Sequence, residues 1–187
     1  MRGFDVVGDD RTLAVREHIA LACRVLHRLG LSPSHLSARL PQSPFILVKT
    51  RGVNARATTR ADVAVIDGEG VAMVDDAGRA LAVGELPLEL ALHLEIYRSR
   101  PDVGAIVHTH QPLATAVLSA GAERPDIPRY PDSGQIRTTE QGVALANALG
   151  AADLVHLHQH GMAITGPSIE EIVARTIELE AWARSTG

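Results

Sequence analysis

The chain is poor in several residue types, and each shortage excludes a class of protein. Cys23 is the single cysteine among 187 residues, so no internal disulfide can form and a reducing compartment, the cytoplasm, is expected. Aromatic residues make up only 3%, so the core must consist of leucine, valine, isoleucine and alanine. No apolar run is long enough to span a bilayer, and the N-terminus is too polar for a signal peptide. A net charge of −4 gives no basic surface, so neither a membrane nor nucleic acid is expected as a partner.

What is present is the composition of an ordinary globular protein, with 45% apolar and 21% charged residues. The length suits one domain, residues 1–187, around one sizeable core. Apolar spacing and capping signals predict helices over residues 11–31, 88–100, 112–120, 138–149 and 168–184. Runs rich in branched residues predict strands over 45–50, 62–67 and 103–110, a hairpin from 70–74 to 81–83, and a strand followed by a turn over 154–165. This order predicts an α/β protein whose helix-covered sheet is only partly parallel.

Two histidines stand two residues apart at the end of one predicted strand, "VGAIVHTH". Residues i and i+2 of a strand share a face, so His108 and His110 are expected to project in the same direction. Two such imidazoles can chelate one divalent ion, and a catalytic zinc site typically has three protein ligands and one open position. The alternative is that both rings only line a half-buried strand.

A second histidine cluster, "VHLHQHG", offers a third ligand. The three candidates alternate along the predicted strand: His156, His158 and His160. His160 precedes Gly161, where the chain must turn, and ligands are easier to gather at a strand end than within a strand. The second cluster therefore favours a metal site over two chance histidines.

Glu89 lies near the start of the predicted helix that leads into the His108 strand. The helix dipole stabilises a carboxylate at that end, and a neighbouring cation would lower its pKa further. Such a group can bind a resting ion and later move a proton. The alternative is a solvated glutamate of the first helical turn. His93, one turn further on, is expected either to support a ligand or to face solvent.

Three stretches of the chain resemble the class II aldolase/adducin family, which includes fuculose-phosphate aldolases and ribulose-phosphate 4-epimerases. They are "GLSPSHLSAR", "ELPLELALHLEIYRSRPDVGAIVHTHQPLATAVLSA" and "LHQHGMAITGPSIEEIVART", which together cover most of the chain in the expected order. The resemblance implies a three-layer α/β/α sandwich with a mostly antiparallel central sheet. It also implies a homo-oligomer, with a tetramer favoured, and an active site near a subunit boundary.

The resemblance also implies roles for individual residues. The metal ligands of the family match His108, His110 and His160, and its acid/base and fourth ligand matches Glu89. The cofactor is therefore expected to be a divalent metal, with Zn²⁺ first and Mn²⁺, Fe²⁺, Co²⁺ or Ni²⁺ as alternatives. His156 and His158 then become strand residues or supporting residues.

The chain departs from the sugar-phosphate enzymes of the family where those enzymes hold a phosphate. A Gly-Asn pair, a Thr-Pro-Ser/Thr-Gly turn and a Ser-Ser pair are replaced by Ser34-His35, by residues 49–52 and by Pro87-Leu88. The last change removes two hydroxyl donors and one backbone N–H. The expected substrate is therefore a small anionic molecule without phosphate. Its predicted binding residues are Ser34, His35, Lys49, Thr50 and Arg51. Lys49 or Arg51 would bind a carboxylate of the substrate; the alternative is that both are solvated turn residues.

The ligand set suits Lewis-acid cleavage of a bond beside a carbonyl group, through a metal-stabilised enediolate. The first hypothesis is a divalent-metal-dependent carbon–carbon lyase of the aldolase type, acting on a small hydroxy-carbonyl or carboxylate substrate. The alternatives are a metal-dependent decarboxylase of a small or aromatic carboxylate, then a dehydratase or an epimerase, then a non-catalytic adducin-like scaffold. Retention of all three histidines and Glu89 argues against the scaffold.

Overall fold

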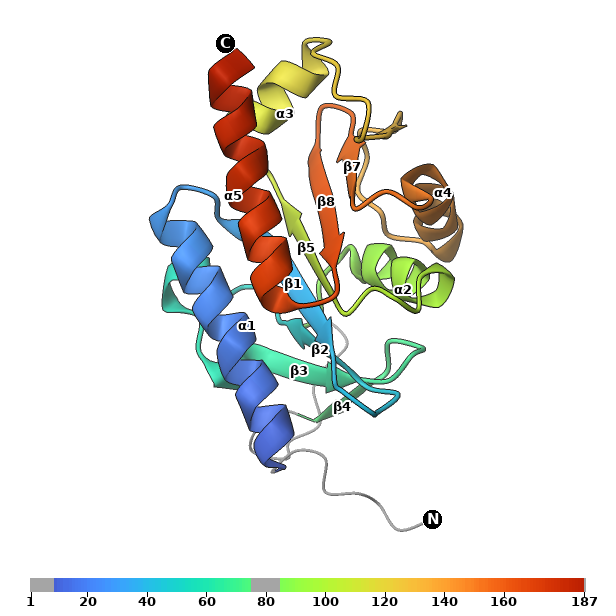
Figure 1. Ribbon diagram of the computed structural model, residues 1–187. Helices are drawn as coiled ribbons and strands as arrows, with labels where there is room; N and C mark the ends of the chain where they lie inside the picture. Colours follow the sequence, from blue (N-terminus) through green and yellow to red (C-terminus); the bar gives the residue numbers. More distant parts are fainter. Residues whose placement is uncertain (1–8, 75–84, 187) are drawn as a thin grey trace.

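A computed structural model describes residues 9–74 and 85–186 (Figure 1). Its strands form one sheet of eight, in the order β4-β3-β2-β1-β5-β8-β7-β6. Every neighbouring pair is antiparallel except β6 and β7, which are parallel. The strands are β1 (Pro33–Arg39), β2 (Ile46–Lys49), β3 (Val63–Ile66), β4 (Ala72–Val74), β5 (Ala105–Thr109), β6 (Arg129–Tyr130), β7 (Leu154–Leu157) and β8 (Gly161–Gly166). The mostly antiparallel sheet is confirmed.

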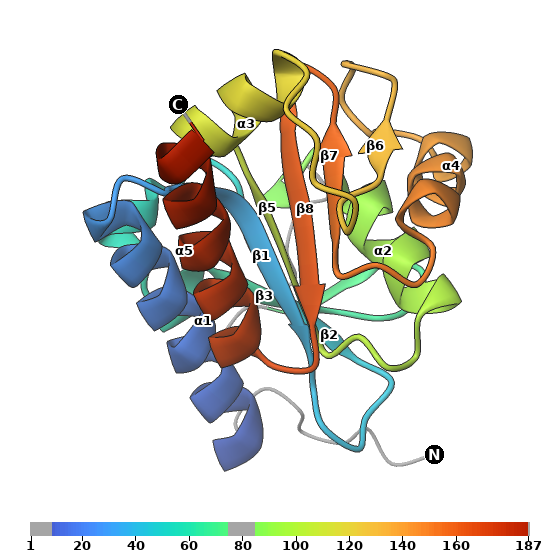
Figure 2. The ribbon, with the colours of Figure 1, turned by 45° about the horizontal axis from the view of Figure 1, so that its top comes forward.

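Helices cover both faces of this sheet. The α-helices are α1 (Asp10–Arg28), α2 (Leu90–Ser99), α3 (Pro112–Ser119), α4 (Thr139–Leu149) and α5 (Ile169–Thr186). Two short 3₁₀ turns, η1 (Ala55–Ala57) and η2 (Arg60–Asp62), precede β3. Helices α1, α3 and α5 pack on one face, and α2 and α4 on the other (Figure 2). The three-layer α/β/α sandwich is therefore confirmed. Among the described helices, none combines the length and apolar character that a membrane span requires.

The alternation of side chains along β5 decides which helices the histidine strand faces. Ala105 and Val107 belong to the apolar cluster beneath α1 and α5, whereas Ile106 belongs to the cluster beneath α2 and α4. Because successive side chains point to opposite faces, His108 lies on the α2 side with Ile106. The functional side chains therefore gather between the sheet and α2.

Local signals set most element boundaries. The predicted capping box of α4 is present: Thr138 Oγ1 accepts from Gln141 N–H, and the Gln141 side chain accepts from the Thr138 N–H. Helix α2 begins at Leu90, two residues after the predicted start, with Glu89 as its N-cap. β4 pairs with β3, whereas the second arm of the predicted hairpin, residues 81–83, lies outside the described residues.

β1 was not predicted as a strand, although it lies near the middle of the sheet between β2 and β5. Its α2-facing positions hold His35 and Ser37, which interrupt the apolar pattern that marks a buried strand. A register shift between Pro33 and His35 places Ser34 in an irregular position of the pairing with β5. Polar side chains in a buried strand indicate that this part of the sheet serves a site.

Candidate metal centre and active site

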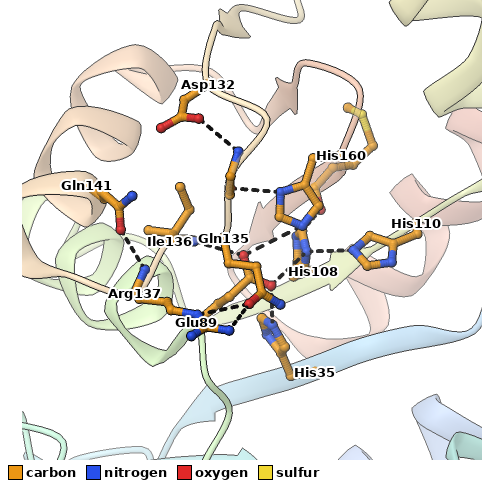
Figure 3. A network of polar contacts seen from close by, with 12 residues as sticks. His35, Glu89, His108, His110, Asp132, Gln135, Ile136, Arg137, Gln141 and His160 are labelled. Atoms are coloured by element: carbon orange, nitrogen blue, oxygen red, sulfur yellow. Dashed lines mark hydrogen bonds and ion pairs between the residues drawn. The ribbon is translucent and has the colours of Figure 1, made fainter.

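Three imidazoles converge beyond the end of β5. His108 is in β5, His110 follows that strand, and His160 lies in the turn between β7 and β8. One ligand nitrogen from each ring lies within 4.8 Å of those of the other two, and Nε2 of His108 is 3.1 Å from Nε2 of His110. Figure 3 shows these rings around a common point with Glu89 beside them. His108 is fully buried, whereas His110 is exposed, so the cluster opens to solvent on the His110 side.

In two of the rings, a hydrogen bond from Nδ1 leaves Nε2 with a free lone pair that faces the other imidazoles. His108 Nδ1–H donates to the Met162 carbonyl at 3.0 Å, and His160 Nδ1–H donates to the Gly134 carbonyl at 3.1 Å. Burial is the main cause that lowers the pKa values of His108 and His110, so the neutral form of both rings is favoured. Converging lone pairs repel unless a cation separates them. Two nitrogens on one tetrahedral zinc lie about 3.3 Å apart, close to the 3.1 Å between His108 Nε2 and His110 Nε2, so the donor set fits a divalent ion.

Gly161 allows the turn to approach β5 this closely. A Cβ at this position would lie 2.7 Å from the Thr109 carbonyl oxygen and 2.7 Å from Cδ2 of His110. Gln159, two residues earlier, has a positive φ of 55°, which turns the chain so that His160 faces the other two imidazoles. The strand therefore ends at Leu157, and the three histidines of "VHLHQH" do not share a face as a regular strand would require.

Glu89 lies at the N-terminus of α2 and faces the imidazoles. Its Oε1 accepts the Ile136 N–H at 3.0 Å, and its Oε2 lies 3.5 Å from His108 Nε2. Oε1 is also 3.6 Å from His160 Nε2. Burial alone would raise the pKa of Glu89, but the adjacent His35 and His108 rings and the Ile136 N–H outweigh it and hold the pKa at about 2. The carboxylate is therefore ionised and near enough to be a fourth ligand.

One of the predicted substrate-binding residues, His35, lies beside this cluster, on the α2 side. The His35 ring stacks on the His108 ring with centroids 4.9 Å apart, and His35 Nε2 is 3.6 Å from Glu89 Oε2. Continuing the register of β1 and β2 beyond the Ser37–Val48 pair sets Thr50 opposite His35. The Thr50 hydroxyl donates to the Asp62 carbonyl at 3.0 Å.

The structure directs Lys49, one of the two predicted cations, away from the cluster. The buried Lys49 ammonium donates to the carbonyls of Thr50 and Val53 at 3.0 and 2.7 Å. Lys49 shares a strand face with Leu47, on the α1 side, so it points away from the histidines. Arg51 is an exposed residue of the following turn, where its N–H donates to the Glu85 carbonyl. Lys49 is therefore not retained as a substrate-binding residue.

The remaining histidines of the second cluster face elsewhere. His156 Nε2 lies 3.2 Å from Ser119 Oγ of α3, on the opposite side of the sheet, and His158 contacts Arg129. The sequence did not indicate that the polar loop over residues 131–138 takes part in the site: its Gly134 carbonyl and Ile136 N–H hold His160 and Glu89. Backbone groups of a loop leave no residue-type signal, so only the folded chain reveals them.

Comparison with solved structures supports the fold. The L-fuculose 1-phosphate aldolase from Glaciozyma antarctica PI12 superposes with a TM-score of 0.77. The match covers 99% of this chain and 76% of that chain at 23% sequence identity. At this level of identity the similarity shows a shared fold with a class II aldolase structure.

The sequence model of the family described as "Class II Aldolase and Adducin N-terminal domain" matches residues 17–186, and the chain belongs to this family. A 3,4-dihydroxyphthalate decarboxylase from Arthrobacter keyseri is 33% identical over 193 residues, covering 90% of this chain and 75% of that protein. A 5-methylthioribulose-1-phosphate/5-deoxyribulose-1-phosphate aldolase from Rhodospirillum rubrum is 27% identical over 188 residues, covering 91% and 79%. The relatives of this chain are thus enzymes of more than one reaction type.

Proposed function

We propose that this protein is a divalent-metal-dependent lyase that decarboxylates a small dihydroxylated aromatic carboxylate. The observation that carries the proposal is the convergence of His108, His110, His160 and Glu89 on one point beyond β5. An adducin-like scaffold has no use for three imidazoles whose lone pairs face one another. The same residues are the ones that the resemblance to the family predicted as ligands and acid/base.

Two observations favour decarboxylation over the aldol cleavage that the sequence analysis ranked first. The relative from Arthrobacter keyseri, a decarboxylase, is more similar to this chain than the aldolase from Rhodospirillum rubrum over a similar share of its length. The positions that hold phosphate in the sugar-phosphate enzymes are occupied here by other residues, including His35 and Pro87-Leu88. Aldol cleavage is the second candidate, because the aldolase relative also matches 91% of the chain.

The residues of the chain account for the proton that this reaction needs. A divalent ion held by the three imidazoles would supply Lewis-acid chemistry to adjacent substrate oxygens. Glu89, ionised at neutral pH, can accept the proton of a substrate hydroxyl at Oε2. When the bond between the ring carbon and the carboxylate breaks, the electron pair stays on the ring carbon and CO₂ leaves. Glu89 then returns its proton to that carbon, so hydrogen takes the place of the carboxylate, and the deprotonated hydroxyl oxygen takes a proton from water as the product leaves.

The experiment uses the purified protein loaded with Zn²⁺ or Mn²⁺ and two substrates, 3,4-dihydroxyphthalate and a ketose 1-phosphate. We expect CO₂ release that matches consumption of the aromatic acid and a product lighter by one CO₂. Glu89→Gln keeps the shape of the side chain but cannot move the proton, so kcat should fall by about 10²–10⁴-fold. Glu69→Gln is the control, because its side chain is 78% exposed and lies outside the site. Cleavage of the ketose into two fragments would favour aldol chemistry, and turnover of neither substrate would refute the proposal.

Zinc as the native metal, the homotetramer and the cytoplasmic location are retained as parts of this proposal. Metal analysis of protein purified without added metal, together with sedimentation at several concentrations, tests the first two. One divalent ion per chain and a mass near four chains are the expected results. A monomer at all concentrations would contradict a site completed at a subunit boundary.

A further inference from the structure

A chain of four buried polar side chains leads through the core between β1 and α2 to Glu89. The Tyr97 hydroxyl lies 2.9 Å from Ser37 Oγ, which lies 2.6 Å from His93 Nδ1. His93 Nε2 lies 2.6 Å from His35 Nδ1, and His35 Nε2 faces Glu89 Oε2 at 3.6 Å. None of the four residues is more than 6% exposed. Buried polar groups are costly unless they are hydrogen-bonded, so each contact must have a defined donor and acceptor.

One order of donors and acceptors suits the charge of Glu89. The 2.6 Å contact between His93 Nε2 and His35 Nδ1 requires a hydrogen on one of these nitrogens and a lone pair on the other. If the Tyr97 hydroxyl donates to Ser37, the Ser37 hydroxyl can donate to His93 Nδ1. His93 Nε2–H then donates to His35 Nδ1, and the hydrogen of His35 lies on Nε2, toward the carboxylate. The reverse order would set a lone pair of His35 against that negative charge.

His35 Nε2 is a donor whose partner is not yet within bonding distance. It is buried and has no hydrogen-bond partner among the described residues, since Glu89 Oε2 at 3.6 Å lies beyond the usual limit of about 3.2 Å. The other carboxylate oxygen, Oε1, is held by the Ile136 N–H. Oε2 therefore lies between His108 Nε2 on one side and His35 Nε2 on the other, at 3.5 and 3.6 Å. A small rotation of the carboxylate about its anchored oxygen would bring it into contact with either ring.

We propose that His35 is a positioning residue for Glu89, held as the Nε2–H tautomer by the Tyr97–Ser37–His93 chain. The proposal rests on the proposed function, in which Glu89 turns from the ligand set toward the substrate. His35 Nε2–H then donates a hydrogen bond to Oε2 and keeps the Glu89 side chain oriented while Glu89 carries the proton. This role differs from the direct substrate contact that the sequence analysis predicted for His35. Loss of the positioning donor of His35 should lower kcat, whereas loss of a substrate contact would raise KM.

The tautomer can be measured without any substrate, so this test is independent of the proposed reaction. Protein with ¹⁵N-labelled histidine is loaded with Zn²⁺, and solid-state ¹⁵N NMR distinguishes protonated from unprotonated ring nitrogens. Signals of His35 are assigned by their loss in His35→Gln, with the exposed His18→Phe as the matched control. We expect a protonated Nε2 and an unprotonated Nδ1 for His35. An unprotonated Nε2, or one shifted by direct zinc binding, would overturn the proposal.

Kinetics separate positioning from substrate contact once a turnover assay exists. His35→Phe keeps a planar ring but removes the donor, and we expect kcat to fall by about 10–100-fold with KM and zinc content nearly unchanged. His35→Gln restores an N–H donor and should recover part of kcat. A raised KM at unchanged kcat would overturn the positioning role, and equal loss in both variants would show that the donor is irrelevant. If His35→Phe does not fold, the tautomer measurement on the unmodified chain still decides the matter.

Discussion

Replacing Gly161 with alanine should weaken metal binding although every proposed ligand keeps its residue type. The new Cβ would lie 2.7 Å from the Thr109 carbonyl oxygen and from His110 Cδ2, where ordinary contact begins at 3.4 Å. The His110 ring can rotate, but the carbonyl oxygen belongs to the backbone of β5 and cannot. The turn that carries His160 must therefore move away from β5 by about 0.7 Å, at a cost of about 1–3 kcal/mol for overpacking.

That displacement acts on the geometry of the ligand set. It separates His160 from His108 and rotates His110, so we expect the dissociation constant for Zn²⁺ to rise by about 10–100-fold, as for disturbed supporting groups of metal sites. Isothermal titration calorimetry with Zn²⁺ measures the affinity, and urea unfolding of the metal-free protein measures the stability separately. Activity should fall with metal occupancy and recover in part at high Zn²⁺ concentration.

Gly68→Ala is the matched control, because a Cβ at that position meets no atom within 4 Å. It should leave the affinity for Zn²⁺ and the unfolding midpoint unchanged. The reasoning is refuted if Gly161→Ala folds and binds Zn²⁺ as tightly as the unmodified chain. In that event the close approach of the β7–β8 turn to β5 would have no bearing on the site.

Two further predictions concern the core. Gly142→Ala would place a Cβ 2.6 Å from the Ala91 carbonyl oxygen in α2, so α4 must shift. The free energy of unfolding, measured by urea titration, should fall by about 1–3 kcal/mol. An unchanged unfolding midpoint would be incompatible with this packing. Burial raises the pKa of the Cys23 thiol to about 12, so at pH 8 it is neutral and should react with a thiol reagent only after denaturation. Rapid modification of the native protein would show that α1 does not bury this side chain.

The paired histidines illustrate what the sequence could predict. His108 and His110 share a direction because strand geometry alone requires it, and the structure places their Nε2 atoms 3.1 Å apart. Strand periodicity makes the three candidates of the second cluster equivalent, the position of His160 before Gly161 favours it, and the resemblance to the family selects it. The turn at Gln159 removes that equivalence, and a positive φ at a glutamine cannot be inferred from its residue type.

The parts that the sequence could not predict depend on tertiary contacts. β1 was missed because its inward-facing His35 and Ser37 are polar, and their partners come from α2, more than fifty residues away. The resemblance aligns Lys49 with a phosphate turn, which leaves open whether it is a substrate cation or a solvated turn residue. Strand alternation directs it to the other face, where backbone carbonyls satisfy its ammonium group.

The central claim is that one divalent ion binds among the imidazoles of His108, His110 and His160. A crystal structure of the protein loaded with Zn²⁺, with anomalous data collected on both sides of the zinc edge, tests it most directly. We expect one anomalous peak with three nitrogen ligands at about 2.0–2.1 Å and Glu89 beside it. A zinc peak elsewhere on the chain, with this cluster empty, would contradict it.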